Sequence, residues 1–328
     1  MTENAAESRP RPRVLVTRRL PADVEARLRT EFSPLLYEDG GPIGLDKIAA
    51  EAEKADALLI TGSEKMTGDA FAALPKSIRI VATLSVGTDH IDLDAARKLG
   101  FVVTNTPDVL TDATADITLL VMLGAARRAY EGQKILREGR WTGWAPTQFL
   151  GTDLRGKRLG VLGMGRIGQA VAARARAFGM KIHYHNRRPV AEAEALAATY
   201  HDTVESLLRV SDVLSLNCPG TPETHHLIND RTIDMMPPNA ILVNTARGSV
   251  VDDEALIRAL KSGRLQSAGL DVFEGEPKVN PGYFDIDNCY ILPHMGSATV
   301  ETRNAMGFCC LDNIAAYFSG QEPPARVA

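Results

Sequence analysis

The sequence contains few cysteines, and their arrangement argues against two common kinds of site. Only four cysteines occur among the 328 residues, and no two of them form a Cys-x-x-Cys pair. A cysteine-based zinc site and a disulfide framework are therefore both disfavoured. Reduced thiols are typical of a cytoplasmic protein, and the sequence points to no metal site.

Long hydrophobic runs and a strong excess of one charge are also missing. The longest apolar stretch, residues 117–126, has about half the length that a membrane-spanning helix needs. The first residues lack the apolar run of a secretory signal, which again favours a cytoplasmic location. The 37 basic and 41 acidic residues leave a net charge of -4, whereas a nucleic-acid-binding domain is usually clearly basic. We therefore expect neither a membrane nor a nucleic-acid partner.

The chain is instead rich in short apolar runs that alternate with amphipathic, helix-like stretches. Its length favours two domains, and this alternation is typical of parallel sheets covered by helices on both faces. The sequence therefore predicts an α/β protein with two doubly wound parallel-sheet domains. The predicted strands are 13–17, 57–60, 78–82 and 101–103 in the first part, and 158–162, 180–184, 213–217, 240–244, 267–270 and 289–292 in the second.

Three helices and one loop complete this prediction. Apolar residues at helical spacing predict one long helix over about 112–138, which an aromatic loop at 141–146 ends. Further helices are expected at 169–178 and at 301–319.

A glycine-rich segment between a predicted strand and a predicted helix indicates a dinucleotide site. Gly163, Gly165 and Gly168 form a Gly-x-Gly-x-x-Gly pattern in the required strand–loop–helix context. The first glycine would allow the turn, the second the close approach of a pyrophosphate, and the third close helix packing. The competing interpretation is a glycine-rich turn that binds nothing.

The end of the next predicted strand indicates which dinucleotide is bound. An NAD-binding unit usually carries Asp or Glu there, to hold the ribose 2′-hydroxyl. This chain has Asn186, followed by Arg187 and Arg188, and two guanidinium groups suit a 2′-phosphate. The pattern favours NADP, although a basic solvated turn would look the same.

Three ionisable residues follow predicted strands in the second part of the chain. Arg247, Glu276 and His294 are candidates for reduction of a 2-keto acid. An arginine can bind the substrate carboxylate, a histidine can donate a proton, and a carboxylate can orient the imidazole. Spacing alone leaves ordinary structural roles open for each of them.

Several long motifs resemble the D-isomer-specific 2-hydroxyacid dehydrogenase family, and within it the glyoxylate/hydroxypyruvate reductases. The resemblance spans about residues 13–324 and rests on separated segments. These are Ser85-Val86-Gly87-Thr88-Asp89-His90, the glycine-rich loop, Trp141-Thr142-Gly143-Trp144, Asn244-Thr245-Ala246-Arg247-Gly248, Gly269-Leu270-Asp271-Val272-Phe273 and Leu292-Pro293-His294.

The resemblance implies roles for individual residues. Arg247 would bind the substrate, His294 would act as the acid/base, and Glu276 would hydrogen-bond to the histidine. Backbone N–H groups of Val86 and Gly87 would hold the substrate carboxylate, and Trp144 would reach the active site of a partner subunit or else be a buried hinge residue. The remaining cofactor-binding positions would be Thr114, Gly163, Gly165, Arg166, Ile167, Gly168, Asn186, Arg187, Arg188, Cys218, Pro219, Thr245, Ala246, Asp271 and Ser297.

The resemblance also implies a domain order and an activity. A flavodoxin-like substrate domain would comprise 13–110 and 297–328, a Rossmann cofactor domain would comprise 111–296, and a cleft would lie between them. The implied function is reduction of glyoxylate and hydroxypyruvate by a homodimer, with NADPH preferred and NAD possible. Alternatives are a dehydrogenase for another 2-keto acid, such as a D-lactate or phenylpyruvate type, and a cofactor-sensing corepressor-like protein.

Overall fold

The computed structural model describes residues 10–37 and 43–328, which form two compact units. The first unit runs to Leu110 and is completed by Thr299–Ala328, whereas Thr111–Ala298 form the second unit. The first unit therefore contains both an early and a late part of the sequence. Residues 1–9, to which the expectation about a secretory signal partly refers, lie outside the described residues.

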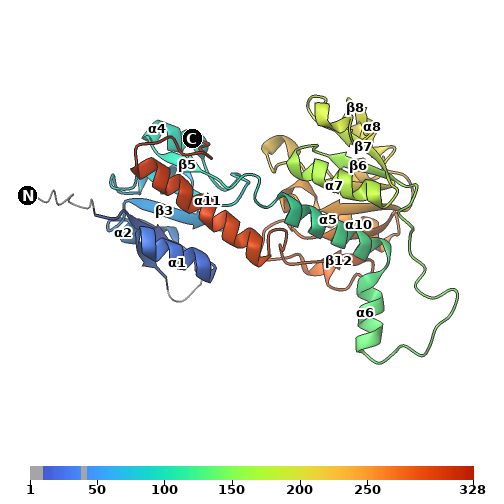
Figure 1. The fold of residues 1–328 in the computed structure, drawn as a ribbon. Coiled ribbons are helices and arrows are strands. Elements are labelled where there is room, and N and C mark those ends of the chain that lie inside the picture. Colours follow the sequence, from blue (N-terminus) through green and yellow to red (C-terminus); the bar gives the residue numbers. More distant parts are fainter. Residues whose placement is uncertain (1–9, 38–42) are drawn as a thin grey trace, which may run out of the picture. The chain divides into compact units, whose positions relative to one another are not determined.

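The first unit is built on a five-stranded parallel sheet (Figure 1). Its strand order, β2-β1-β3-β4-β5, is that of flavodoxin-like folds and confirms the predicted class. The strands are β1 (Arg13–Val16), β2 (Ser33–Leu36), β3 (Ala57–Thr61), β4 (Ile80–Leu84) and β5 (Val102–Thr104). The helices are α1 (Ala22–Glu31), α2 (Leu45–Ala52), α3 (Gly68–Ala72), α4 (Leu93–Leu99) and α11 (Val300–Phe318).

The second unit contains a seven-stranded parallel sheet in the order β12-β11-β10-β9-β6-β7-β8. This is the Rossmann order with one added strand, and the direction of strand addition reverses between β6 and β9. In such sheets ligands bind at the carboxyl ends of the strands beside this reversal. The strands are β6 (Arg158–Leu162), β7 (Lys181–His185), β8 (Thr199–His201), β9 (Val213–Leu216), β10 (Ala240–Asn244), β11 (Leu265–Leu270) and β12 (Cys289–Ile291).

Two apolar clusters cover the two faces of this second sheet. One joins the sheet to α5 (Thr111–Ala126) and α7 (Arg166–Ala177), and the other joins it to α8 (Val204–Leu208), α9 (Asp230–Ile233) and α10 (Asp253–Lys261). Strands buried on both faces carry nearly continuous apolar runs, which is why the sequence reveals them clearly.

The prediction of one long helix over 112–138 is wrong, because this segment forms two helices in the structure. After α5 the chain turns at Arg128, whose φ of 53° is left-handed, and α6 (Ala129–Arg137) begins there. In the part of the chain that the structure describes, no helix, α5 included, is long and apolar enough to cross a membrane.

Two strands, β2 and β8, were not predicted from the sequence. Both are edge strands, and each contains exposed or half-buried positions instead of a fully buried run. Because an edge strand is less completely covered than a central one, its sequence carries a weaker hydrophobic signal.

Candidate active site

The glycine-rich loop connects β6 to α7 at the point where the strand order reverses. Gly163 has a φ of 99°, and a Cβ there would lie 2.7 Å from the backbone of Asn217. A Cβ on Gly168 would lie 2.2 Å from the carbonyl oxygen of Gly163, so this close packing also needs glycine. A Cβ on Gly165, which precedes the first turn of α7, would meet nothing within 4 Å. The loop is thus closely packed at Gly163 and Gly168 and has free space beside Gly165, as a bound pyrophosphate requires.

Arg166 and Ile167 form the first turn of α7. Arg166 is exposed, whereas Ile167 packs against the apolar cluster that joins the sheet to α5 and α7. The unpaired N–H groups of a helix N-terminus attract phosphate, so these residues stand where a dinucleotide phosphate would bind. The residues of this loop therefore fit a dinucleotide.

The basic pair follows β7 directly. Asn186 is half-buried and its carbonyl oxygen accepts a hydrogen bond from the hydroxyl of Tyr200 at 3.3 Å, while Arg187 and Arg188 are both exposed. The pKa of Glu223, in the loop after β9, is lowered by its bonds with Thr221 and its own backbone and further by Arg187. The loops after β7 and β9 are therefore electrostatically linked at this edge of the sheet.

Cys218 and Pro219 also follow β9, directly after the strand and Asn217. Burial raises the pKa of the Cys218 thiol to about 11, so the side chain is neutral at physiological pH. The structure thus places an uncharged side chain at the start of the loop after β9.

The three candidate catalytic residues follow three adjacent strands, β10, β11 and β12. Arg247 comes after β10, Glu276 after β11 and His294 after β12. Because the strands are parallel, all three residues lie at the same edge of the sheet. Their positions after predicted strands suggested a single site, and in the structure they follow neighbouring strands of one sheet.

Glu276 and His294 are in direct contact. Nδ1 of His294 lies 2.7 Å from Oε2 of Glu276, and the N–H of Phe273 donates to Oε1 at 2.7 Å. Burial opposes the charge on Glu276, but the bond and charge of His294, the Phe273 N–H and Arg247 together hold the pKa of the carboxyl below its ordinary value. A charged carboxylate therefore faces the imidazole.

A tight turn fixes Arg247. The side-chain amide of Asn244 donates to the carbonyl oxygen of Arg247 at 2.9 Å, and its oxygen accepts from the N–H of Ala246 at 3.0 Å. In the same turn, the hydroxyl groups of Thr245 and Thr118 lie 2.7 Å apart, which ties the turn to α5. The guanidinium of Arg247 donates to the carbonyl of Ala246 at 2.7 Å.

Asp271 holds the loop that carries His294. Its carboxylate oxygens accept from the N–H groups of Met295 at 2.6 Å and Gly296 at 2.8 Å, and its carbonyl accepts from the N–H of His294 at 2.8 Å. These bonds maintain the left-handed backbone of His294, whose φ is 53°. Burial raises the pKa of Asp271 although these N–H donors oppose that effect. In this structure the carboxylate positions the histidine loop.

Thr114 and Ser297 lie beside the same loop. Thr114, near the start of α5, is buried and donates from its hydroxyl to the carbonyl of Gly296 at 3.2 Å. Ser297 follows directly and is half-buried. Both residues therefore lie within the second unit beside the histidine loop.

Val86 and Gly87 belong to the first unit, in the loop after β4. Their carbonyl oxygens accept hydrogen bonds from the amide of Asn105 at 2.9 Å and the hydroxyl of Ser85 at 2.8 Å. Among residues 10–37 and 43–328, nothing accepts a hydrogen bond from their backbone N–H groups. Two fixed, available N–H groups are suited to bind a carboxylate.

Trp144 lies in the long loop after α6. Its side chain is 81% exposed, so it is not the buried hinge residue that the sequence left open. Figure 1 shows α6 and this loop extending away from the sheet of the second unit.

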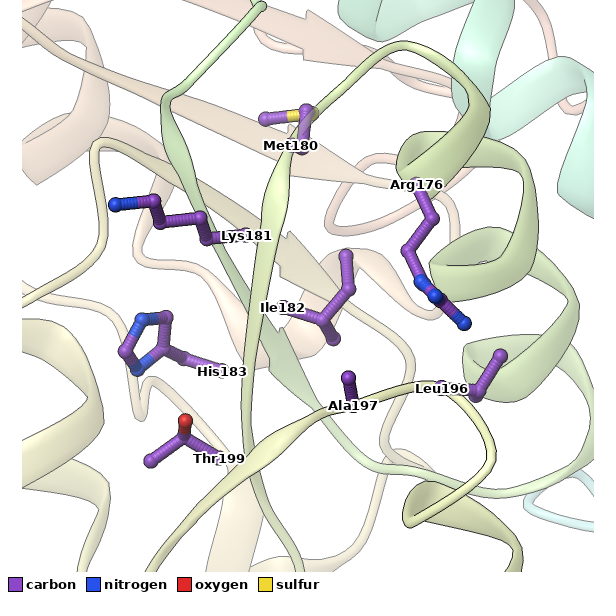
Figure 2. A pocket seen from close by; sticks show the side chains of 8 residues that line it. All are labelled: Arg176, Met180, Lys181, Ile182, His183, Leu196, Ala197 and Thr199. Carbon is purple, nitrogen blue, oxygen red and sulfur yellow. The ribbon is translucent and has the colours of Figure 1, made fainter.

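A hollow of about 300 Å³ beside β7 lies away from these residues. In Figure 2, Ile182 points towards Arg176 and Leu196, whereas Lys181 and His183 point to the other side of the strand. Its cationic groups are thus divided between two sides, and it involves the amino end of β7 instead of the carboxyl end where the glycine loop lies. We assign it no part in the site.

Sequence reasoning missed the residues that position the site. Asn244 and Phe273 act through an amide and a backbone N–H, and the pattern of residue types does not reveal such roles. Asp271 was predicted near the cofactor, but its bonds to the histidine loop were not expected. Their only signal in the sequence is that each lies within a few residues of a candidate catalytic side chain.

The fold and this strand-end site define a nicotinamide-dependent oxidoreductase, and comparisons with known proteins agree. Residues 119–296 match the model for "D-isomer specific 2-hydroxyacid dehydrogenase, NAD binding domain". The chain is 44% identical over 312 residues to a glycerate dehydrogenase from Hyphomicrobium methylovorum, covering 94% of this chain and 97% of the relative. It is 42% identical over 321 residues to a glyoxylate reductase from Thermococcus onnurineus, covering 97% and 96%.

A solved structure is similar over the same length. It is an NADPH-dependent glyoxylate/hydroxypyruvate reductase from Sinorhizobium meliloti in complex with NADP and malonate, with a TM-score of 0.87, 38% identity and 97% coverage of both chains. The chain belongs to the D-isomer-specific 2-hydroxyacid dehydrogenase family. Its cofactor is a nicotinamide dinucleotide, and its substrate is a small keto or hydroxy acid.

Proposed function

We propose that this protein reduces glyoxylate and hydroxypyruvate to glycolate and D-glycerate, with NADPH as the preferred cofactor. The observation that carries the proposal is the 2.7 Å contact between His294 and Glu276, on strand ends next to that of Arg247. The names of relatives, glycerate dehydrogenase and glyoxylate reductase, support this substrate class.

Arg247 would recognise the substrate. A guanidinium donates two parallel hydrogen bonds to a carboxylate, and its charge polarises a neighbouring carbonyl group. The turn held by Asn244 fixes the Arg247 backbone, which reduces the entropy lost when substrate binds. The available N–H groups of Val86 and Gly87 would bind the substrate carboxylate as well.

His294 would supply the proton. When bound, the nicotinamide cofactor provides the hydride for the keto carbon. The Nδ1 of His294 is engaged by Glu276, which leaves Nε2 as the nitrogen that donates to the substrate oxygen. The negative charge of Glu276 stabilises the protonated imidazole before this transfer.

The residues after β7 would select NADPH. Arg187 and Arg188 are exposed and positively charged, and a guanidinium binds phosphate oxygens in bidentate fashion. Asn186 has no negative charge that would repel a 2′-phosphate. The Sinorhizobium meliloti reductase, described as NADPH-dependent, supports this preference. NADH would serve as a weaker substrate.

The α6 arm, which we define as residues 129–151, would form a homodimer interface. Apolar side chains are unusually exposed along it: Leu136 at 62%, Trp141 at 50%, Trp144 at 81% and Leu150 at 64%. Exposed apolar patches of this kind mark protein–protein contacts. A second copy of this chain would cover them, and Trp144 would reach the partner's substrate.

A panel of keto acids measured with both cofactors tests the proposed activity. Purified protein should oxidise NADPH in the presence of glyoxylate or hydroxypyruvate, with higher kcat/KM than with pyruvate or phenylpyruvate. A preference for the bulkier acids would instead indicate another 2-hydroxyacid dehydrogenase. Binding of NADPH without turnover of any keto acid would support a cofactor-sensing role and contradict the proposal.

A further inference from the structure

Two consecutive histidines and a glutamate lie close together in the second unit. His225 and His226 follow the short helix at Pro222–Thr224, and Glu274 follows β11. Nε2 of His226 lies 2.9 Å from both carboxylate oxygens of Glu274, and Nε2 of His225 lies 3.5 Å from one of them. One ligand atom from each side chain falls within 4.8 Å of the others.

The backbone turns at His226 so that both imidazoles face the carboxylate. Consecutive side chains of an extended segment point to opposite sides, but His226 has a left-handed φ of 47°. The two rings consequently stack with centroids 4.0 Å apart. The N–H of His226 donates to the carbonyl of Ser249 at 2.9 Å, and the amide of Asn229 donates to the carbonyl of His226 at 2.8 Å. This uncommon conformation of His226 is therefore held by hydrogen bonds to its backbone N–H and to its carbonyl oxygen.

The surroundings of the cluster are acidic and open. A hollow of about 690 Å³ is lined by His226 and Glu274 together with three further acidic residues, Asp252, Asp253 and Glu254, and one basic residue, Lys278. Asp253 accepts from the hydroxyl of Tyr283 at 2.8 Å, and Glu254 accepts from the amide of Asn280 at 2.8 Å. These carboxylates have other partners, but their charges raise the local concentration of cations.

We propose that His225, His226 and Glu274 form a binding site for one divalent transition-metal ion of the zinc class. Imidazole nitrogen and carboxylate oxygen are ligands that zinc, nickel and copper accept, and zinc commonly has three protein ligands plus water. The sequence pointed to no metal site, since its cysteines form no metal-binding pattern. The histidine pair becomes a candidate only because Glu274, 48 residues later, lies beside it.

The competing explanation for the cluster is a hydrogen bond between His226 and Glu274 that forms without any metal ion. It accounts for the 2.9 Å contacts but not for His225, whose ring nitrogen is directed at the same carboxylate. Substitution of His225 leaves the His226–Glu274 bond intact and removes one proposed ligand. This residue therefore separates the two explanations.

Bound metal would also cross-link two distant segments of the chain. Metal that binds only the folded protein stabilises it in proportion to the logarithm of its concentration. At a concentration about 100 times the Kd, the unfolding temperature of a domain of this size should rise by roughly 5–10 °C.

The test uses chelator-treated full-length protein without a histidine tag. Calorimetric titration with Zn²⁺ and the absorption spectrum with Co²⁺ report the stoichiometry and ligands, and neither depends on enzyme activity. We expect one ion per chain with a Kd in the micromolar range or below. His225→Ala and Glu274→Gln should each weaken binding at least tenfold and remove the metal-dependent rise in unfolding temperature.

The matched control is His201→Asn, because Nε2 of His201 lies 3.0 Å from Nδ1 of His183 and forms the other close histidine pair. This variant should bind Zn²⁺ as the native protein does. Binding that survives His225→Ala unchanged, or that is lost in His201→Asn, overturns the assignment. So does a Kd for Zn²⁺ above about 1 mM in the native protein, since that is weaker than the range in which proteins hold functional ions.

Discussion

The Nδ1 atom of His294 lies 2.7 Å from Oε2 of Glu276, and this contact sets the direction in which the imidazole can transfer a proton. Loss of a general acid typically costs about 10²–10⁴ in rate. His294→Ala should therefore lower kcat by that order while the KM for NADPH stays near normal. Glu276→Gln should lower kcat less, because glutamine keeps a hydrogen bond but loses the charge.

Steady-state kinetics with glyoxylate check this prediction. His201→Asn serves as the histidine control and should retain native turnover. Near-native kcat in His294→Ala would remove the histidine from the proposed role.

The basic residues after β7 should determine cofactor choice. Arg187→Ala combined with Arg188→Ala removes the proposed ligands of the 2′-phosphate, and charged hydrogen bonds of this kind are worth about 1.5–3 kcal/mol each. The KM for NADPH should rise at least tenfold while the KM for NADH changes little. Arg209→Ala, on the exposed end of α8, is the control for losing an exposed arginine outside the loop after β7. Equal increases for both cofactors would refute selection by the 2′-phosphate.

The phosphate loop should respond differently to methyl groups at its glycines. A Cβ on Gly168 would lie 2.2 Å from a backbone oxygen, so Gly168→Ala should lower both the unfolding temperature and cofactor affinity. A Cβ on Gly165 would meet nothing in the protein, so Gly165→Ala should weaken cofactor binding without destabilising the free protein. Thermal unfolding and fluorescence titration with NADPH measure the two effects. If both variants bind NADPH normally, the loop does not hold the pyrophosphate.

The α6 arm should control assembly. Native protein is expected to sediment as a dimer at micromolar concentration, and Leu136→Ala combined with Trp144→Ala should shift it towards monomer. Burial of a large apolar side chain contributes about 1.5–3 kcal/mol, so two substitutions are sufficient to weaken a micromolar dimer measurably. A native protein that sediments as a monomer would contradict the proposed interface.

An ion pair between neighbouring strands should give stability that depends on pH. Asp212 accepts from the Arg158 guanidinium at 2.7 and 3.0 Å and from the Arg158 N–H at 2.8 Å. These bonds, the side-chain pair first, hold the pKa of Asp212 below its ordinary value. Its contribution is therefore present above the unfolded pKa of about 3.9 and is lost as pH falls through the lower folded pKa.

Urea unfolding of Asp212→Asn checks this expectation. The variant should be less stable than the native protein by about 1 kcal/mol between pH 5 and 7, and the difference should shrink below about pH 4. Asp285→Asn is the control, because Asp285 is exposed and has no ion pair within the described residues. A difference that grows as the pH falls would show that the pair is not the cause.

Most of the fold was predictable because buried parallel strands carry continuous apolar runs. The runs at β6 and β10, for example, match the observed strands from end to end. The edge strands β2 and β8 and the break at Arg128 were missed, because partial burial and a single left-handed residue leave little trace in hydrophobic spacing. The predicted site residues at the ends of β10, β11 and β12 meet at one edge of the sheet, although their chemical roles stay predictions.

The sequence by itself determined the class of each domain, the glycine loop and the residue types available for chemistry. Only the tertiary structure decided which of those residues touch. Glu276 was a candidate by its position after a strand, but its contact with His294 depends on the parallel register of β11 and β12. The same holds for Glu274 and His226, since hydrogen-bond distances between residues far apart in the chain are set by packing and not by local sequence.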